Sequence, residues 1–180
     1  MAIEGVRDRL LRSTAALEAA NLPYAVVGGN AVAEWVGRVD KAAVRFTQDV
    51  DLLIRREDLP SAIEILQKAG FFYHESFGVS FFLDGPQASP RDAVHLIFSG
   101  EKVKERDTIA APDVTASERA EHFKITSLES LVTMKLTAFR DKDRVHLRDM
   151  LGVGLIDASW VVRLSSPLRE RLQELLDNPE

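Results

Sequence analysis

Hydrophobic and polar residues follow two different periods along the first part of the chain. Apolar side chains recur at helical spacing over residues 6–20 and again over residues 59–69. Short, continuously apolar runs at residues 24–27 and 50–54 are typical of buried strands. Residues 30–36 read as a short helix between these two runs. The pattern therefore predicts the order helix, strand, helix, strand, helix.

The second part of the chain changes from strand-like to helical patterning. Three further strand-like runs are separated by turn residues and lie at 71–74, 79–83 and 93–98. Three helical stretches then follow at 128–139, 144–151 and 168–176. We therefore predict an α+β fold with a mixed sheet flanked by helices over residues 1–112. A helical C-terminal segment, residues 113–180, is expected to pack on that core.

The composition narrows the possible classes of protein. The 180 residues are 46% hydrophobic and 28% charged, which is ordinary for a folded globular domain. The net charge is −5, so any nucleic-acid binding has to come from a local basic patch. There is no cysteine, which excludes disulfides, zinc–thiolate sites and thiol nucleophiles. No apolar run is long enough to span a membrane, so we expect a cytoplasmic protein without a membrane partner.

Two carboxylates provide the strongest chemical signal. Asp49 and Asp51 are two residues apart at the start of a predicted strand, so their side chains project from the same face. Two such carboxylates repel each other unless a positive charge lies between them. A divalent metal ion that also binds nucleotide phosphates is the usual positive charge. Asp49 and Asp51 are therefore the candidate metal ligands.

Three motifs follow one another in a fixed order along the chain. They are Gly28-Gly29-Asn30-Ala31, then Arg45-x-Thr47-x-Asp49-Val50-Asp51, then Lys135-Leu136-x-Ala138-Phe139-Arg140-Asp141-Lys142-Asp143 with Asp149 behind it. With these motifs the chain resembles the nucleotidyltransferase superfamily, and within it the AbiEii/AbiGii group of toxin-like nucleotidyltransferases, over residues 22–152, most of the chain. An Asp-x-Asp pair alone occurs by chance in many strands, whereas the three motifs in this order are much more specific.

The resemblance implies a polymerase-beta-like fold and a metal-dependent transfer of a nucleoside monophosphate from an NTP to a hydroxyl. The acceptor implied is RNA, including tRNA, or protein, in a toxin–antitoxin setting with a neutralising antitoxin protein. The cofactor implied is Mg²⁺, or alternatively Mn²⁺. The residues implied in nucleotide binding are Gly28, Gly29, Asn30, Thr47, Lys135, Arg140 and Asp143, the last of these orienting the two cations.

Glycines suit this task because the backbone can approach phosphate oxygens closely. The N-terminus of the helix that follows Gly28 and Gly29 would offer N–H groups to an anion. The later basic segment admits two interpretations. Lys135, Phe139 and Lys142 are spaced by four and seven residues, which places them on one face of a predicted helix. Such a face either binds phosphates or is simply a solvated, charged helix surface.

His95 stands where the family usually carries a third carboxylate, on the strand predicted over residues 93–98. An imidazole can act there as a base or as a ligand, and Mn²⁺ accepts a nitrogen ligand more readily than Mg²⁺ does. We therefore count His95 with Asp49 and Asp51 as a candidate catalytic residue. Two alternatives stay open. One is a weak or inactive relative that binds nucleotide or RNA, or serves as an interaction module, and the other is a partner protein whose aspartates are structural.

Overall fold

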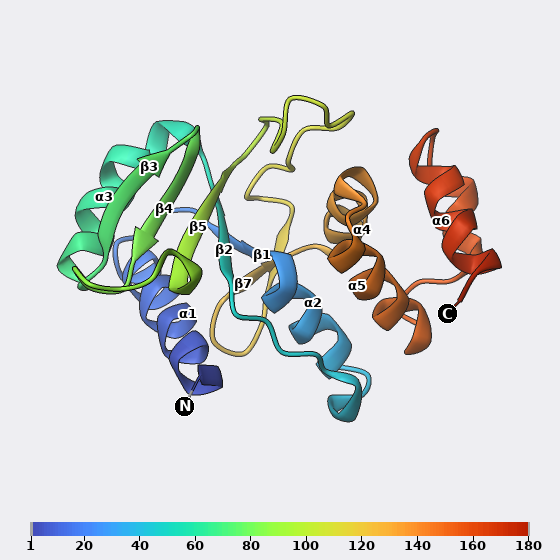
Figure 1. Cartoon of the computed structure of the whole chain (residues 1–180), viewed down its shortest axis with the longest axis horizontal. Helices are drawn as coiled ribbons and strands as arrows, with labels where there is room; N and C mark the ends of the chain where they lie inside the picture. Colours follow the sequence, from blue (N-terminus) through green and yellow to red (C-terminus); the bar gives the residue numbers. More distant parts are fainter. Residues whose placement is uncertain (1, 180) are drawn as a thin grey trace.

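A seven-stranded mixed sheet forms the centre of the molecule in the computed structural model (Figure 1). The structure describes the backbone of residues 2–179 and the side chains of residues 5–90 and 92–179. The strands are β1 (Ala25–Val27), β2 (Val50–Ile54), β3 (Phe72–Ser76), β4 (Val79–Leu83), β5 (Ala93–Phe98), β6 (Ser117–Arg119) and β7 (Lys124–Thr126). Their order in the sheet is β3-β4-β5-β2-β1-β7-β6. The β2–β5 and β1–β7 pairs are parallel, and the remaining pairs are antiparallel.

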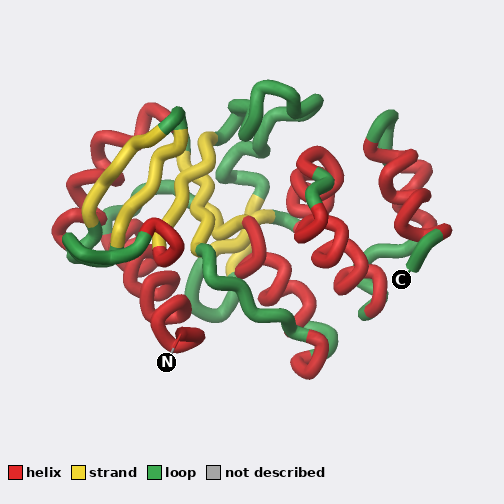
Figure 2. Tube along the Cα trace, viewed as in Figure 1, coloured by secondary structure: helices red, strands yellow, loops and turns green. Residues whose placement is uncertain are grey.

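The α-helices lie on both sides of this sheet (Figure 2). They are α1 (Ala2–Ala19), α2 (Gly28–Gly37), α3 (Leu59–Lys68), α4 (Leu128–Ala138), α5 (Asp141–Gly152) and α6 (Leu168–Asp177). Short 3₁₀ helices occur at Lys41–Ala43, Arg56–Asp58, Pro90–Asp92 and Ala158–Arg163. The α+β architecture with a mixed sheet is confirmed, as are the strands expected at residues 50–54, 79–83 and 93–98. No helix within residues 2–179 has both the length and the apolar character needed to cross a membrane.

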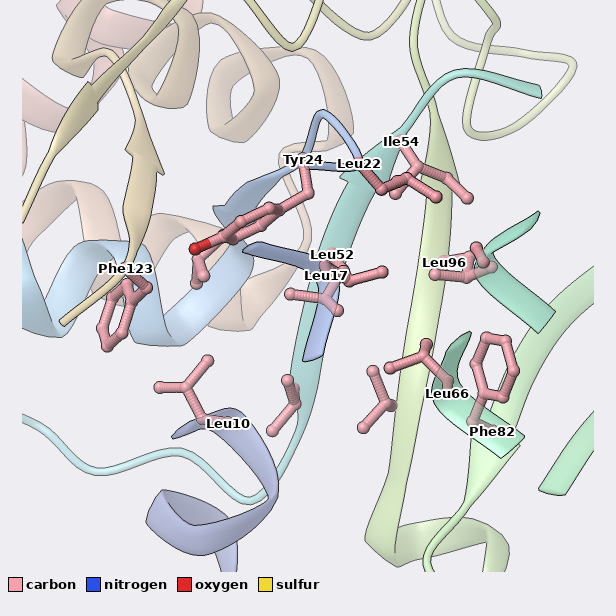
Figure 3. Close-up of a cluster of buried hydrophobic side chains, with 14 of the residues drawn as sticks. Leu10, Leu17, Leu22, Tyr24, Leu52, Ile54, Leu66, Phe82, Leu96 and Phe123 are labelled. Carbon is pink, nitrogen blue, oxygen red and sulfur yellow. The ribbon is translucent and has the colours of Figure 1, made fainter. Parts of the chain in front are cut away.

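One hydrophobic core lies between the sheet and helices α1 and α3 (Figure 3). Leu17 of α1 and Leu66 of α3 are fully buried there against Leu52 of β2 and Phe82 of β4. Successive strand residues point to opposite faces. Leu52 therefore faces these helices, and its neighbour Asp51 points to the other face of the sheet.

A second core joins α2 to the three C-terminal helices. Val32 of α2 packs in it with Leu136 of α4, Leu147 of α5 and Leu172 of α6. The last helix is therefore an integral part of the fold. Arg171 of α6 also donates hydrogen bonds to the carbonyls of Leu136 and Thr137, at 2.6 and 2.7 Å, which satisfies the C-terminal end of α4.

The structure corrects two sequence-based expectations. Strands β6 and β7 were not predicted, and through them the sheet continues beyond residue 112. The basic segment was expected to place Lys135 and Lys142 on one helical face, but the two residues lie in different helices, α4 and α5. The helix is interrupted because Phe139 adopts a left-handed conformation with φ +47°. This reversal turns α5 back towards α4.

Candidate active site

The two glycines of the first motif are packed directly against the second motif. Gly28 begins α2 immediately after β1, with φ +67°, and a Cβ atom there would lie 2.1 Å from Oδ2 of Asp51. A Cβ atom on Gly29 would lie 2.8 Å from the Cβ of Thr47. Both contacts are shorter than real Cβ atoms tolerate. The glycines are therefore required for the carboxylate and the threonine to lie where they do.

The segment that carries Asp49 is held from two sides. Nδ2 of Asn30 donates to the carbonyl of Asp49 at 2.7 Å, which fixes the segment to the start of α2. On the other side, the Arg45 guanidinium donates to both carboxylate oxygens of Asp149 in α5, at 2.9 and 3.0 Å. Within the segment, the Asp49 N–H donates to Oγ1 of Thr47 at 3.4 Å. These bonds explain the roles of Asn30, Arg45 and Thr47 in the motif.

The N-terminus of α2 is open towards this segment. Its N-cap residue is Val27, and no side chain in the described part of the chain caps the helix. The first N–H groups of such a helix have no partner within the helix and carry a partial positive charge. The end of α2 can therefore bind an anion such as a phosphate.

Asp51 and His95 are neighbours across the parallel β2–β5 pair. Their Cα atoms are register partners, and Nδ1 of His95 lies 4.0 Å from Oδ1 of Asp51. Burial raises the pKa of Asp51, and the negative charge of Asp49 adds to this rise. The nearby His95, Lys135 and Lys142 act in the opposite direction. The ionised Asp51 is therefore short of compensating positive charge, which a bound cation would supply.

A buried ion cluster lies beside the carboxylates. Asp143 is 1% exposed and pairs with Nζ of Lys135 at 2.9 Å and with Nε of Arg140 at 2.7 Å. Burial lowers the pKa of Lys135, although the charge of Asp143 opposes this shift. Burial alone would raise the pKa of Asp143, but Arg140 and Lys135 outweigh it, so the pKa of Asp143 is lowered. Lys135 is almost fully buried, whereas the Arg140 side chain is 43% exposed. Arg140 can therefore reach a ligand while Asp143 holds it in place.

The structure adds Lys142 to the predicted site residues. Its Nζ lies 3.6 Å from Oδ2 of Asp49, and both side chains are partly exposed to solvent. The sequence contains a signal for this residue, because Lys142 lies inside the Arg140–Asp143 motif. The helical-face argument also included Lys142, but it placed the residue on one helix with Lys135, whereas Lys142 lies in α5. The structure thus brings together all ten residues predicted from the sequence, with Lys142 in addition.

The donor set determines what kind of metal site is possible. Within the described residues, no group of three or more His, Asp or Glu side chains could hold a metal ion by itself. Asp49 and Asp51 provide two carboxylates, with His95 as their neighbour. Mg²⁺ typically binds to one or two carboxylates and completes its octahedral shell with substrate phosphates and water. The residues present therefore fit an Mg²⁺ ion that arrives with a nucleotide.

A pocket of about 220 Å³ adjoins the site without containing the carboxylates. Asn30 and Thr47 form part of its wall, together with Leu10 of α1, Glu34 of α2 and His122 of the β6–β7 turn. The pocket therefore lies on the α1 side of the segment that carries Asp49. It is separate from the Lys135–Asp143 cluster.

Comparisons with known proteins relate the chain by fold. No protein-family model matches the sequence, and no curated protein matches it. Among solved structures, the antibiotic-resistance factor ANT(2″)-Ia in solution superposes with a TM-score of 0.64 at 18% identity, covering 98% of this chain and 97% of that one. A crystal structure of ANT(2″)-Ia in complex with adenylyl-2″-tobramycin has a TM-score of 0.53 at 17% identity, covering 92% of this chain and 95% of that one.

A third solved structure is similar to the same extent. The antigenic nucleotidyltransferase-like protein from Paracoccidioides brasiliensis has a TM-score of 0.63 at 18% identity, covering 99% of this chain and 91% of that one. These similarities extend over nearly the whole of each chain, and the identities are low enough that they relate the proteins by fold alone. Together with the glycine pair placed against Asp51, they lead to one conclusion. This chain has the nucleotidyltransferase fold.

Proposed function

We propose that this protein is a nucleotidyltransferase that moves a nucleoside monophosphate from an NTP to a hydroxyl and releases pyrophosphate. The observation that carries the proposal is the contact between Gly28 and Asp51. It places a carboxylate pair beside the open N-terminus of α2. Arg140 precedes α5 as its N-cap residue and Lys142 lies in the first turn of α5, where both can balance the charge of a triphosphate. Phosphoryl transfer depends mainly on such positioning and charge balance.

Each group in the site has a specific task in this proposal. The N–H groups at the start of α2 bind phosphate oxygens, and Arg140 neutralises the charge that develops on the leaving pyrophosphate. Asp143 and Lys135 fix the position of Arg140. Asp49 and Asp51 would hold Mg²⁺ or Mn²⁺, which supplies positive charge to the phosphates when it is bound. His95 would accept the proton of the attacking hydroxyl, as a base beside Asp51.

The finer assignment concerns the acceptor and the biological setting. The resemblance to the AbiEii/AbiGii group supports RNA, including tRNA, or protein as the acceptor, with an antitoxin protein as a partner. The fold neighbour solved with adenylyl-2″-tobramycin supports a small-molecule acceptor instead. The test of function therefore has to include all three classes of acceptor.

The direct test uses each of the four NTPs, labelled at the α-phosphate, with Mg²⁺ or Mn²⁺. Total RNA, a protein extract and a small-molecule extract serve as acceptors. We expect label in one of these fractions, and no label with Asp49→Ala or Asp51→Ala. Circular dichroism and thermal unfolding of the variants show whether they remain folded. Full transfer by folded Asp49→Ala and Asp51→Ala variants would refute the proposal, since these are the carboxylates that would hold the metal.

His95 supports a second candidate function, that of a nucleotide-binding protein with weak or no catalysis. It occupies the register position beside Asp51 where the family resemblance calls for a carboxylate. In this case the wild-type protein binds labelled NTP in equilibrium dialysis but transfers none of it. The His95→Asp variant should then gain transfer activity. A wild-type protein that is fully active, and that loses activity in His95→Asp, would exclude this candidate.

A further inference from the structure

A row of ring side chains runs across the sheet to the catalytic carboxylate. His74 of β3 is the register partner of Phe81 in β4, Phe81 is the partner of His95 in β5, and His95 is the partner of Asp51 in β2. Register partners point to the same face of a sheet. The four side chains therefore form one continuous line on the face that carries Asp51.

The rings in this row are in contact. His74 and Phe81 are stacked, with centroids 5.8 Å apart and ring planes inclined by 19°. Phe81 and His95 have centroids 6.1 Å apart at 46°. Neighbouring strands are about 4.8 Å apart, so Phe81 lies roughly 10 Å from Asp51, about the length of a one-ring molecule with a short side arm.

Within residues 2–179, no α-helix packs on this face of β3 and β4. Helices α1 and α3 pack on the opposite face, where they bury Phe82 and Leu96 (Figures 1 and 3). On the open face, Phe72 is 43% exposed and Val79 is 48% exposed. Phe72 and Val79 therefore flank the row of rings on the exposed part of this face. At the β5 end of the face, Ala93 is fully buried and Ile97 packs against the cluster that contains Ala111 and Val114.

Charge distinguishes this face from the other side of the site. The side chains that β3, β4 and β5 place on it are Phe72, His74, Ser76, Val79, Phe81, Leu83, Ala93, His95 and Ile97. None of these is an acidic side chain, a lysine or an arginine. The cations Lys135, Arg140 and Lys142 belong to α4 and α5, which pack with α2 beyond the other edge of β2. Among these strand residues a polycation would find no carboxylate beyond the aspartates of β2 and the segment before it, and a nucleic-acid backbone would find no lysine or arginine.

The geometry of the transfer connects the two sides. In an in-line displacement the attacking hydroxyl and the leaving group lie on opposite sides of the phosphorus. The leaving pyrophosphate belongs with the cations of α4 and α5, so the acceptor has to approach from the β5 side. We propose that the open face of β3 and β4, together with His95 of β5, is the acceptor site, and that it takes a small molecule carrying a hydroxyl next to a flat, uncharged aromatic ring. This inference rests on the function proposed above.

The transfer proposed at this site forms one bond to phosphorus, breaks another and moves one proton. The hydroxyl oxygen of the acceptor forms a bond with the α-phosphorus of the NTP. The bond from that phosphorus to the oxygen bridging the β-phosphorus breaks, and its electron pair leaves with pyrophosphate. The hydroxyl proton passes to the His95 ring. The acceptor ring meanwhile stacks on Phe81 and His74, which orients the hydroxyl but takes part in no bond change.

A binding experiment tests the face without any turnover. The probe is N-acetyltyrosinamide, a neutral phenol, and N-acetylserinamide is the matched hydroxyl compound without a ring. Ring C–H signals of the four histidines are followed by NMR during the titration, so His122 and His146 serve as internal references. We expect the signals of His74 and His95 to shift with the phenol alone. Equal shifts with the serine compound, or no shift with the phenol, would overturn the proposal.

Variants show whether the rings of His74 and Phe81 are responsible for phenol binding. His74→Ala and Phe81→Leu should weaken phenol binding roughly three- to ten-fold, as expected from loss of an aromatic stacking contact. Phe77→Leu is the matched control, because Phe77 is fully exposed at the tip of the β3–β4 hairpin and lies outside the row. His74 is itself exposed, so its replacement leaves the core intact even if Phe81→Leu perturbs folding. Unchanged binding in both ring variants would refute the inference.

Competing ligands and turnover separate this inference from the proposed function. Tobramycin and a short single-stranded RNA should leave the His74 signal unchanged, and a shift with either would assign the face to that class instead. If the enzyme transfers nucleotide, Phe81→Leu should raise the KM for the acceptor and leave the KM for the NTP unchanged. An active enzyme without this effect refutes the acceptor face alone. If the phenol shifts the His74 and His95 signals of a protein that transfers no nucleotide, only the transferase function is refuted.

Discussion

Oδ2 of Asp51 occupies the space that a side chain at Gly28 would need. A Cβ atom on residue 28 would lie 2.1 Å from this oxygen, and Gly28 also has a left-handed φ of +67°. The contact joins the end of β1 to the second residue of β2, which are antiparallel neighbours in the sheet. The glycine is therefore required both for its conformation and for the space that it leaves.

Gly28→Ala separates these two requirements when it is compared with Gly100→Ala. Gly100 has a similar φ of +74° but nothing within 4 Å of the added Cβ, so its replacement introduces backbone strain of about 1–2 kcal/mol. We expect Gly28→Ala to lower the free energy of unfolding by more than this and to abolish transfer, because Asp51 has to move. Urea unfolding and the labelled transfer assay measure the two effects. Equal losses of stability in the two variants would contradict the prediction.

Asp143→Asn should be one of the most destabilising polar substitutions in the chain. It leaves the buried Lys135 ammonium without its carboxylate partner, and breaking a buried ion pair in this way costs about 3–5 kcal/mol. Glu174→Gln is the control, since Glu174 pairs with Arg144 on the surface and should contribute less than about 1 kcal/mol. Both values come from urea unfolding at neutral pH. A similar small loss in the two variants would show that Asp143 does not hold a charged Lys135.

His146 makes the free energy of unfolding change with pH in the mildly acidic range. Burial, with the nearby Lys135 charge, lowers the pKa of His146 to about 4 in the folded protein. The unfolded chain takes up this proton at about pH 6.5. The unfolded state therefore binds more protons between these two values, so the free energy of unfolding falls as the pH drops from about 6.5 to about 4. His146→Gln should reduce this slope in urea unfolding across that range, and an unchanged slope would contradict the prediction.

Lys142→Met should affect nucleotide binding far more than folding. The side chain is half exposed, and its ion pair with Asp49 contributes less than about 1 kcal/mol to stability. Loss of its charge next to the triphosphate should raise the KM for the NTP roughly ten-fold, which corresponds to about 1.4 kcal/mol. Lys68→Met, at the exposed end of α3, serves as the control and should leave the KM unchanged. An unaltered KM in Lys142→Met would remove Lys142 from the nucleotide site.

The sequence predicted the strands that carry the catalytic candidates because most residues of these strands are apolar and buried. β2 and β5 lie at the centre of the sheet, and their apolar runs are long enough to stand out. β6 and β7 were missed because each has three residues, and Lys124 and Arg119 interrupt any apolar run. Their place in the sheet depends on tertiary contacts, such as the hydrogen bond from Nε1 of Trp35 to the carbonyl of Thr126.

The pattern separated the helical stretches 128–139 and 144–151, but it did not predict the turn between α4 and α5 or the start of α5 at Asp141. No glycine or proline marks this turn, and Phe139 itself adopts the left-handed conformation that glycine usually provides at the end of a helix. Tertiary contacts hold the turn: the Arg144 and Arg171 guanidinium groups both lie over the Phe139 ring. Helical periodicity therefore identified the right residues but assigned Lys142 to the wrong helix. The pairing of Lys135 with Asp143 depends on this turn and could not be derived from residue spacing.

The register between β2 and β5 has a consequence for how easily this site can change. Histidine and aspartate codons differ only in their first base, so a single base substitution would place a carboxylate at position 95. The parallel pairing already sets that position opposite Asp51, and the chain between residues 51 and 95 needs no adjustment. Among natural variants of this gene, a switch between an imidazole and a third carboxylate is therefore one of the shortest mutational steps open to the protein.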